Sequence, residues 1–225
     1  MDYASFLHQQ VAALVEQYFA NINIAWIAVP DLEWLTRRQS MDGGQVAALP
    51  GFAPDEGIIW RDAKGRVELW ARAEEKATEG TDLYNRAWRE FVKLNAKTQP
   101  VSEVNGRKLQ VDHLYPETAA ARLGLSHVRL LPVDARPNRT VGSTVEKAAA
   151  GPKPGSLRPR FATPFTLAKA SGFQQSFAKR NNSTDVARAL WDYLRAQGYP
   201  VSTGSLAALE VGLTASTLDW FRGDR

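Results

Sequence analysis

The apolar residues at the start of the chain recur every three or four positions. Between residues 3 and 19 they form one stripe, made up of Tyr3, Phe6, Leu7, Val11, Leu14, Val15 and Tyr18. This spacing predicts an amphipathic helix that turns its apolar side towards a core. The apolar run over residues 22–30 is read either as a buried strand or as the end of the same helical region.

The pattern in the middle of the chain predicts a hairpin followed by a helix. The apolar segments 58–60 and 67–70 flank a polar turn, which is typical of a hairpin. A helix is predicted from Thr81 or Asp82, as its N-cap, to about Asn95. Its apolar side carries Leu83, Ala87, Trp88, Phe91 and Leu94.

A second hairpin is predicted at Asn105-Gly106. This dipeptide joins two strand-like arms within residues 101–111, and Asn-Gly between such arms is the strongest short-range signal for a hairpin. The second arm ends at Asp112 and His113.

The last third of the chain is predicted to be helical, with a linker before it. Residues 148–160 hold three prolines and two glycines among basic residues, so we place the main domain boundary there. Residues 183–198 predict a helix that begins with a capping Ser or Thr and ends at Gly198. Its apolar face carries Val186, Leu190, Trp191 and Leu194.

Residues 205–223 have the layout of two short helices joined at a glycine. An alanine-rich segment leads to Gly212, and a polar Thr-Ala-Ser start follows soon after. This layout resembles the helix-turn-helix of repressor-like proteins, and residues 166–180 carry a fainter version of it. The resemblance implies that the polar start of the second helix faces the major groove of DNA through Thr214, Ser216 and Thr217. Plain helical packing is the alternative.

Side chains suited to chemistry gather within residues 109–143. This stretch holds two of the three histidines of the chain, His113 and His127. One strand-like segment runs directly into Asp112 and His113, and a second begins at His127. Asn138 follows in a basic, turn-rich segment.

The order of these residues resembles the HNH endonucleases, the ββα-metal or His-Me finger family. An Asp-His pair is followed by a proline three residues on, by a polar residue before a short strand, and by a final Asn. His127 follows His113 by 14 positions and Asn138 follows it by 25. The likeness covers about a sixth of the chain and departs from the family in one place, because His127 stands where Asn is common.

The resemblance implies a role for each residue of the stretch. His113 would be the general base, and Asp112 and Asn138 would be metal ligands. His127 would support catalysis by bracing the loop through hydrogen bonds. The fold implied for this stretch is a ββα-metal finger.

Phosphodiester hydrolysis gives these residue types a purpose. It needs a base that activates water and a cation that stabilises charge on the phosphate and the leaving oxygen. Histidine, with an unperturbed pKa of about 6.5, suits the first role. Oxygen ligands suit one hard divalent ion, with Mg²⁺ expected first and Mn²⁺ or another divalent ion as alternatives. Because neighbouring strand residues point to opposite faces, Asp112 and His113 can share a site only if the strand ends or bends there.

The alternative is that these residues are structural. Asp-His pairs occur by chance, and a lone histidine is more often a hydrogen-bonding residue than a catalyst. The joint order of Asp112, His113, Pro116, His127 and Asn138 around two apolar strands favours the nuclease. Glu117 and Glu146 are read as solvated surface carboxylates.

The net charge of +4 is unevenly distributed. Residues 1–99 hold 11 basic and 14 acidic side chains, whereas residues 100–225 hold 17 and 10. Within residues 136–180 only Glu146 opposes a block of basic residues, namely Arg136, Arg139, Lys147, Lys153, Arg158, Arg160, Lys169, Lys179 and Arg180. We interpret this block as a surface for DNA, which we expect to be double-stranded, because phosphate contacts release condensed counterions. A solubilising linker is the alternative.

Composition sets the remaining bounds. A chain of 225 residues, of which 44% are hydrophobic, is long enough for a good core. The absence of cysteine excludes disulfides and thiolate zinc sites. No apolar run approaches the roughly 18 residues of a membrane span, and the first residues lack the basic start of a signal peptide. A cytoplasmic protein without membrane contact is expected, although an exported effector would look the same.

The sequence thus predicts an α+β protein in four parts. Residues 1–98 form a mixed helical and hairpin region of unknown role, and residues 99–150 form the ββα-metal nuclease core. Residues 151–160 are the linker, and residues 161–225 form a helical, helix-turn-helix-like DNA-binding domain.

Three functions are consistent with these patterns. The first, which we favour, is a divalent-metal-dependent DNA endonuclease of restriction, phage or mobile-element type. The second is a toxin or effector nuclease with a cognate immunity protein. The third is a non-catalytic DNA-binding regulator. A homodimer is compatible with all three.

Overall fold

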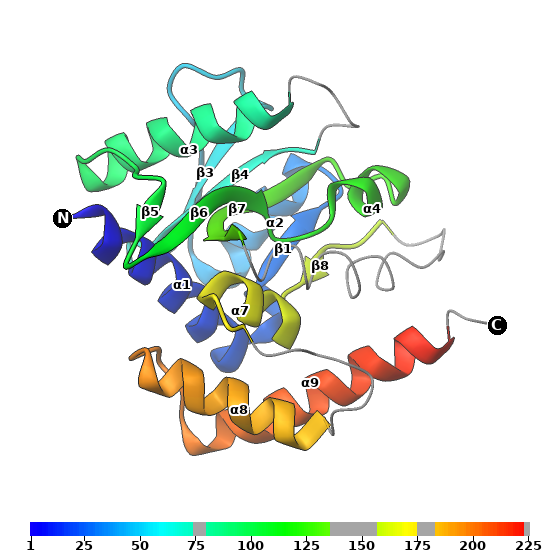
Figure 1. Cartoon of the computed structure of the whole chain (residues 1–225). Helices are drawn as coiled ribbons and strands as arrows, with labels where there is room; N and C mark the ends of the chain where they lie inside the picture. The colour runs from blue at the N-terminus through cyan, green and yellow to red at the C-terminus, as the bar shows by residue number, and fades with distance from the viewer. Residues whose placement is uncertain (74–79, 136–156, 175–182, 223–225) are drawn as a thin grey trace.

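A computed structural model describes residues 1–73, 80–135, 157–174 and 183–222 (Figure 1). Within these ranges the chain is a mixed α+β protein built on an antiparallel sheet. The main path of the sheet is β2 (Gln45–Ala48), β3 (Gly57–Arg61), β4 (Val67–Arg72), β7 (His127–Asp134), β1 (Trp26–Val29) and β8 (Arg160–Phe161). Strand β6 (Arg107–His113) also pairs with β7, and β5 (Glu103–Val104) pairs with β6.

Strand β7 is the centre of this sheet. Along one edge it pairs with β4, where Leu130 lies opposite Leu69. Along its other edge it pairs first with β1, where Val128 lies opposite Ala28, and then with β6, where Leu130 lies opposite His113. All eight residues of β7 are buried, including the polar residues His127, Arg129 and Asp134, because the strand is paired along both edges and covered on both faces.

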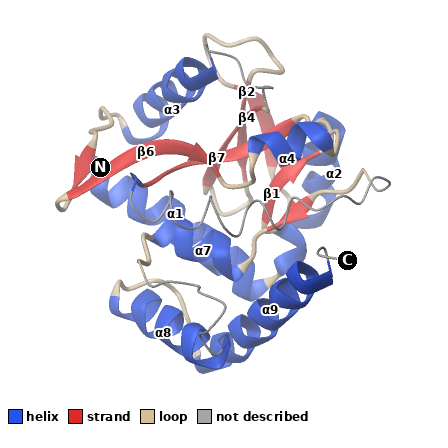
Figure 2. Cartoon of the chain, turned by 45° about the vertical axis from the view of Figure 1, so that its right-hand side comes forward, coloured by secondary structure: helices blue, strands red, loops and turns tan. Residues whose placement is uncertain are grey.

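Helices cover both faces of the sheet (Figure 2). Neighbouring strand residues separate onto the two faces: Ile59 belongs to the large core and Ile58 to a small one. The small core is closed by α2 (Leu32–Asp42), whose Leu35 packs on Trp60 and Trp70 among others. The large core is closed by α1 (Tyr3–Ala20), α3 (Gly80–Ala96), α4 (Glu117–Arg122), α7 (Pro164–Ser171), α8 (Ser183–Ala196) and α9 (Thr203–Arg222).

Local sequence signals account for several of these elements. Helix α1 matches the predicted span, and the 22–30 segment resolves into the short 3₁₀ helix Ile22–Ile24 followed by β1. The predicted hairpin forms as β3 and β4, and the predicted second helix forms as α3. The Asn105-Gly106 hairpin is also confirmed. Both residues have positive φ, 52° and 75°, which is what a tight turn between two twisted strands requires.

The predicted domain boundaries are wrong. Strand β8 adds to the sheet beside β1, with Phe161 opposite Trp26, and Leu167 of α7 is fully buried in the large core. The described part of residues 161–225 therefore continues the core of residues 1–134 and is not a separate helical domain. The same holds for the described residues 99–135, because β7 pairs with β4 and β1. Proline and glycine indicate an irregular backbone, but not whether the following segment returns to the core.

The helix-turn-helix prediction for residues 205–223 is also wrong. Helix α9 runs without interruption through Gly212. A Cβ atom at this position would lie 2.6 Å from the Tyr18 hydroxyl and 2.9 Å from Cγ of Pro164. Gly212 thus marks a close crossing of α9 with α1 and α7, where only a hydrogen fits. The small residue that suggested a turn serves helix packing instead.

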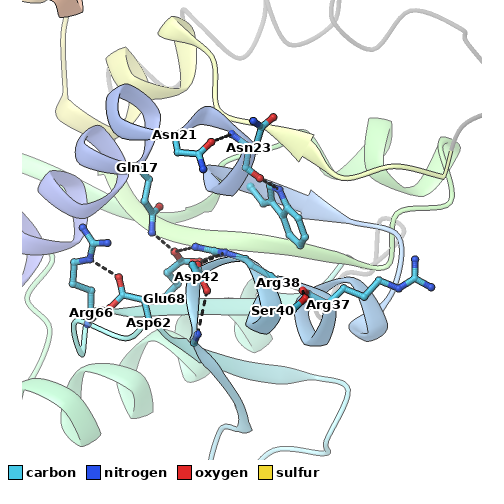
Figure 3. A network of polar contacts seen from close by, with 12 residues as sticks. Gln17, Asn21, Asn23, Arg37, Arg38, Ser40, Asp42, Asp62, Arg66 and Glu68 are labelled. Carbon is cyan, nitrogen blue, oxygen red and sulfur yellow. Dashed lines mark hydrogen bonds and ion pairs between the residues drawn. The ribbon is translucent and has the colours of Figure 1, made fainter.

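A buried network of charged groups joins the sheet to α1 and α2 (Figure 3). Glu68 of β4 accepts two hydrogen bonds from Arg38 of α2, at 2.7 and 2.9 Å, and one from Gln17 of α1 at 2.6 Å. Arg129 of β7 lies 3.4 Å from the same carboxylate and donates to Gln17 at 2.8 Å. Arg38 also pairs with Asp42, so two guanidiniums meet two carboxylates.

The network keeps Glu68 ionised. Burial by itself would raise the pKa of Glu68, but the guanidiniums of Arg129 and Arg38 and the hydrogen bonds it accepts outweigh burial and lower the pKa to about 2. Because this value lies below the usual 4.5, the carboxylate stabilises the folded state above pH 4.5. That stabilisation is lost as the pH falls from 4.5 towards 2.

The first prediction concerns Glu68→Gln. The free energy of unfolding should fall by roughly 3–5 kcal/mol, because two buried guanidiniums lose a charged partner. Urea unfolding at pH 7 measures this change. Glu33→Gln is the matched control, since its ion pair with Arg37 is largely exposed and should contribute at most about 1 kcal/mol. Glu68→Gln should also lack the loss of stability below pH 4.5 that Glu68 gives the unsubstituted protein. Equal effects of the two substitutions would contradict a structural role for the network.

The second prediction concerns Gly212→Ala. Helix propensity alone would make this change stabilising by up to about 1 kcal/mol. We expect the opposite, a loss of about 1–3 kcal/mol, because the new methyl group collides with Tyr18 and Pro164. Gly204→Ala in the same helix is the control, since its nearest contact would be an ordinary 3.9 Å. Thermal unfolding measures both, and a higher melting temperature for Gly212→Ala would show that α9 does not pack this closely.

Candidate active site at the end of β6

Asp112 and His113 lie together at the end of β6. They are its last two residues, and the backbone bends directly after them. The amide of His113 donates to Oδ1 of Asp112 at 2.8 Å, and Nε2 of the imidazole lies 3.4 Å from the same oxygen. The end of the strand thus lets two neighbouring side chains meet, as the sequence requires of a shared site.

Lys169 joins these two residues from helix α7. Its ammonium lies 3.0 Å from Oδ2 of Asp112 and donates to the carbonyl oxygen of His113 at 2.9 Å. Lys169 is 1% exposed, so both contacts are shielded from water. The sequence indicated Lys169 only as one of nine basic residues in a block. Lys169 reaches the site because α7 packs against β7. No pattern of neighbouring residues in the sequence indicates this packing.

These neighbours keep the Asp112 carboxyl group charged. Burial would raise its pKa, but the imidazole of His113, the ammonium of Lys169 and the hydrogen bonds from both residues lower the pKa below its ordinary value. A buried carboxylate is therefore held in its anionic form, which is the form that binds a cation.

Glu117 and Tyr84 complete the surroundings of the His113 ring. Oε2 of Glu117, in the first turn of α4, lies 3.9 Å from Nε2, so this residue is not the isolated surface carboxylate that we expected. The ring of Tyr84 meets the imidazole edge to face at 6.3 Å. The i, i+4 spacing of His113 and Glu117 is a weak signal that could have been noticed in the sequence.

The carboxylates near Nε2 favour the tautomer of His113 that carries its proton there. The lone pair then lies on Nδ1, which is buried and has no hydrogen-bond partner in the part of the chain that the structure describes. Nδ1 is thus an acceptor without a described partner, and it could act as a general base only on a molecule that reaches this buried atom.

His127 lies elsewhere, at the start of β7. Its Nδ1 contacts the Ser126 hydroxyl at 2.6 Å, and its Nε2 contacts the carbonyl oxygen of Asp55 at 2.8 Å. Burial lowers the pKa of His127, so the neutral ring is favoured. These contacts tie β7 to the loop before β3. Such contacts are typical of a residue that supports the fold. Neither contact of His127 is made to His113.

Carboxylate oxygens of the kind that hard divalent ions prefer lie at the end of β6, and one of them is already paired with the Lys169 ammonium. Asp112 offers a carboxylate, Glu117 a second one nearby, and Mg²⁺ is typically bound by one or two carboxylates together with water and substrate phosphate. Within the described ranges no cluster of three His, Cys, Asp or Glu residues forms a complete metal site. Asn138, the second predicted ligand, lies outside these ranges.

Two of the basic residues that were predicted to contact DNA, Arg158 and Arg160, lie on one described segment. The segment from Leu157 to Arg160 runs beside α4, with Leu157 close to Gly124. The pKa of Tyr115, two residues after His113, is raised by burial, and nearby Arg160 and Arg122 oppose that rise. Arg158 is exposed, and no ion pair with an acidic residue is formed by Arg122, Arg158 or Arg160 across the described chain. Arg122 and Arg160 therefore lie near Tyr115, and Arg158 is exposed on the same short segment as Arg160; these three residues are called the basic surface.

The other predicted contacts are not at this surface or cannot be placed. Thr214 lies on α9, where its hydroxyl donates to the carbonyl oxygen of Glu210. The side chains of Ser216 and Thr217 are outside the described residues. So are Arg136, Arg139, Lys147, Lys153, Lys179 and Arg180.

No family model, curated protein or solved structure matches this chain. The site must therefore be judged by its own geometry. Among the helices that the structure describes, none combines the length and the apolar character needed to cross a bilayer.

Proposed function

We propose that this protein is a divalent-metal-dependent DNA endonuclease of the HNH type. The observation that carries the proposal is the meeting of Asp112 and His113 at the end of β6, antiparallel to β7 and backed by Lys169 and Glu117. A buried anionic carboxylate lies within 3.4 Å of an imidazole whose Nδ1 is left without a partner among the described residues.

His113 is the proposed general base. With its proton on Nε2, the ring accepts a proton at Nδ1 from the water that attacks the phosphorus atom. Tyr84 and Glu117 hold the ring in its orientation, so the lone pair keeps one direction. His127 contributes indirectly by fixing the start of β7 against the loop at Asp55.

Asp112 is the proposed metal ligand of the described chain, with Asn138 as its expected partner. The ion, when bound, would stabilise negative charge on the phosphate and the leaving oxygen. The residues Arg122, Arg158 and Arg160 would bind neighbouring phosphates, since cations without acidic partners are available to a polyanion. Arg122 was not among the contacts that the sequence indicated.

The third prediction tests the base. His113→Ala should lower the cleavage of a supercoiled plasmid in Mg²⁺ by at least about 10²-fold, while the affinity for a labelled duplex in EDTA stays unchanged. His8→Ala, which removes the exposed histidine of α1, is the matched control and should cleave normally. Circular dichroism confirms that both variants are folded. Undiminished cleavage by His113→Ala would refute the assigned role, and duplex binding without any cleavage by the unsubstituted protein would favour the regulator.

The fourth prediction tests the basic surface. Arg158→Ala/Arg160→Ala should weaken duplex binding and reduce the slope of log K against log salt by about 1–2, because each phosphate contact contributes about 0.9. The rate at saturating DNA should change little. Arg37→Ala/Lys93→Ala removes the same charge from exposed positions that pair with acidic residues and should leave the slope unchanged. If both double variants lower the slope equally, net charge rather than this surface governs binding.

A further inference from the structure

Strand β2 forms an open end of the sheet. It is the first strand of the main path, so it pairs along one edge only, with β3. Three of its four residues are exposed, which shows that no described element covers its outer edge. An uncovered strand edge presents backbone donors and acceptors to any extended chain that approaches it.

The pairing of β2 with β3 determines which backbone groups point outwards. The amide of Leu49, directly after β2, donates to the carbonyl oxygen of Gly57 in β3 at 2.8 Å. Residues of an antiparallel ladder alternate between bonding to the neighbouring strand and pointing away from it. Ala47 therefore also bonds to β3, whereas Val46 and Ala48 turn their N–H and C=O groups outwards. Within the described chain these four groups form no hydrogen bond.

This edge lacks the features by which free strands avoid pairing with another chain. Residues 44–49 contain no charged residue and no proline, and the register of β2 with β3 is unbroken. Charged side chains, proline and bulges are the usual protection of an edge. The strand is also held firmly at its start. A Cβ atom on Gly44 would lie 2.1 Å from the Trp60 ring, so the backbone packs directly against this buried indole.

The two ends of the β2 edge differ in charge. At the start of β2, Gln45 lies opposite Arg61, which is exposed and forms no ion pair within the described chain. At the other end the carboxylates of Asp55 and Glu56 share one cation, Arg72, which leaves one negative charge. Two copies of such an edge attract each other when they run antiparallel, because the basic end of each lies alongside the acidic end of the other. Parallel pairing would bring like charges together.

We propose that β2 pairs with β2 of a second copy of this chain, so that one antiparallel sheet continues across a symmetric dimer. The two-fold axis passes beside Ala47, which faces its own copy, and Val46 of each chain lies opposite Ala48 of the other. In this register the eight outward groups of the two copies form four hydrogen bonds. A contact of this kind uses the same surface on both copies and therefore closes at two. The dimer goes beyond the proposed nuclease and requires neither a metal ion nor DNA.

The fifth prediction concerns Ala48→Pro, which removes one outward N–H group and no hydrogen bond to β3. Proline is tolerated on the outer edge of a sheet, so the variant should fold. Sedimentation of the full chain in EDTA measures its mass over a wide range of concentrations. The unsubstituted protein should approach twice the monomer mass of 24.9 kDa as its concentration rises, because a short contact gives a weak dimer. Ala48→Pro should keep the monomer mass throughout.

A second variant keeps the test decisive if proline disturbs the fold. Ala47→Lys places two ammonium groups next to each other at the two-fold axis and should also abolish the dimer. Val211→Lys is the matched control, because it adds the same charge at an exposed position of α9 and should leave the dimer intact. Circular dichroism and thermal unfolding check that each variant is folded.

The register is tested with single cysteines, since the chain has none of its own. Ala47→Cys should form a covalent dimer on oxidation, because the Cα atoms of a pair without hydrogen bonds lie about 4.5 Å apart, within the reach of a disulfide. Ala48→Cys is the matched control one position along the strand. Its two copies would lie more than about 7 Å apart, too far for a disulfide to form.

Three results would overturn the proposal. A monomer at every concentration would show that a second copy does not occupy this edge. A dimer that persists in a folded Ala48→Pro or Ala47→Lys variant would place the contact elsewhere on the molecule. Equal crosslinking of Ala47→Cys and Ala48→Cys would contradict the register. None of these measurements involves DNA or a metal ion, so each of these results leaves the nuclease proposal unchanged.

Discussion

The carboxylate of Glu68 is the point on which the arrangement of the sheet depends. It lies within the sheet on β4 and receives hydrogen bonds from α1 and α2, while Arg129 approaches it from β7. Burying one charge without a partner would be unfavourable by several kcal/mol, so the four elements must come together at once for the network to be satisfied. An apolar cluster of the same size would allow these elements to shift relative to one another. The hydrogen bonds of Arg38 and Gln17 are directional and do not allow such a shift.

This constraint positions the proposed site through β7. Arg129 fixes β7 against β4, and the neighbouring residue Leu130 lies opposite His113 across the other edge of the strand. The end of β6 is thereby placed where α7 covers the sheet, and Lys169 can reach it. Strand β7 thus connects the buried network to the site. Such a strand is a better support for reacting groups than a loop would be.

The cluster at the end of β6 shows how a buried carboxylate can be kept ionised. A carboxylate that is buried alone would take up a proton, and a carboxylate that is exposed would change its orientation freely. At Asp112 burial and charge are reconciled by Lys169 and by the amide of His113. The same groups fix the imidazole beside it. Orientation of the imidazole and ionisation of the carboxylate therefore have one physical source.

The sequence by itself determined the features that depend on neighbours along the chain. The stripe of α1, the β3–β4 hairpin and the Asn105-Gly106 turn follow from side-chain periodicity and from backbone angles that few residues adopt. The pairing of Asp112 with His113 was likewise visible, because the two residues are adjacent and the strand ends there. In each case the deciding interaction lies within a few residues.

Only the tertiary structure decided which distant groups meet. Arg38 and Glu68 are 30 positions apart, and Lys169 binds a carbonyl group 56 positions away, so neither contact leaves a local pattern. Gly212 looks like a turn in the sequence but lies within a helix, because what matters there is the space left by Tyr18 and Pro164. The continuation of the core beyond the proline-rich segment has the same origin. A chain folds back wherever its apolar surface can be buried, and that depends on the shape of the whole sheet rather than on the residues that lead to it.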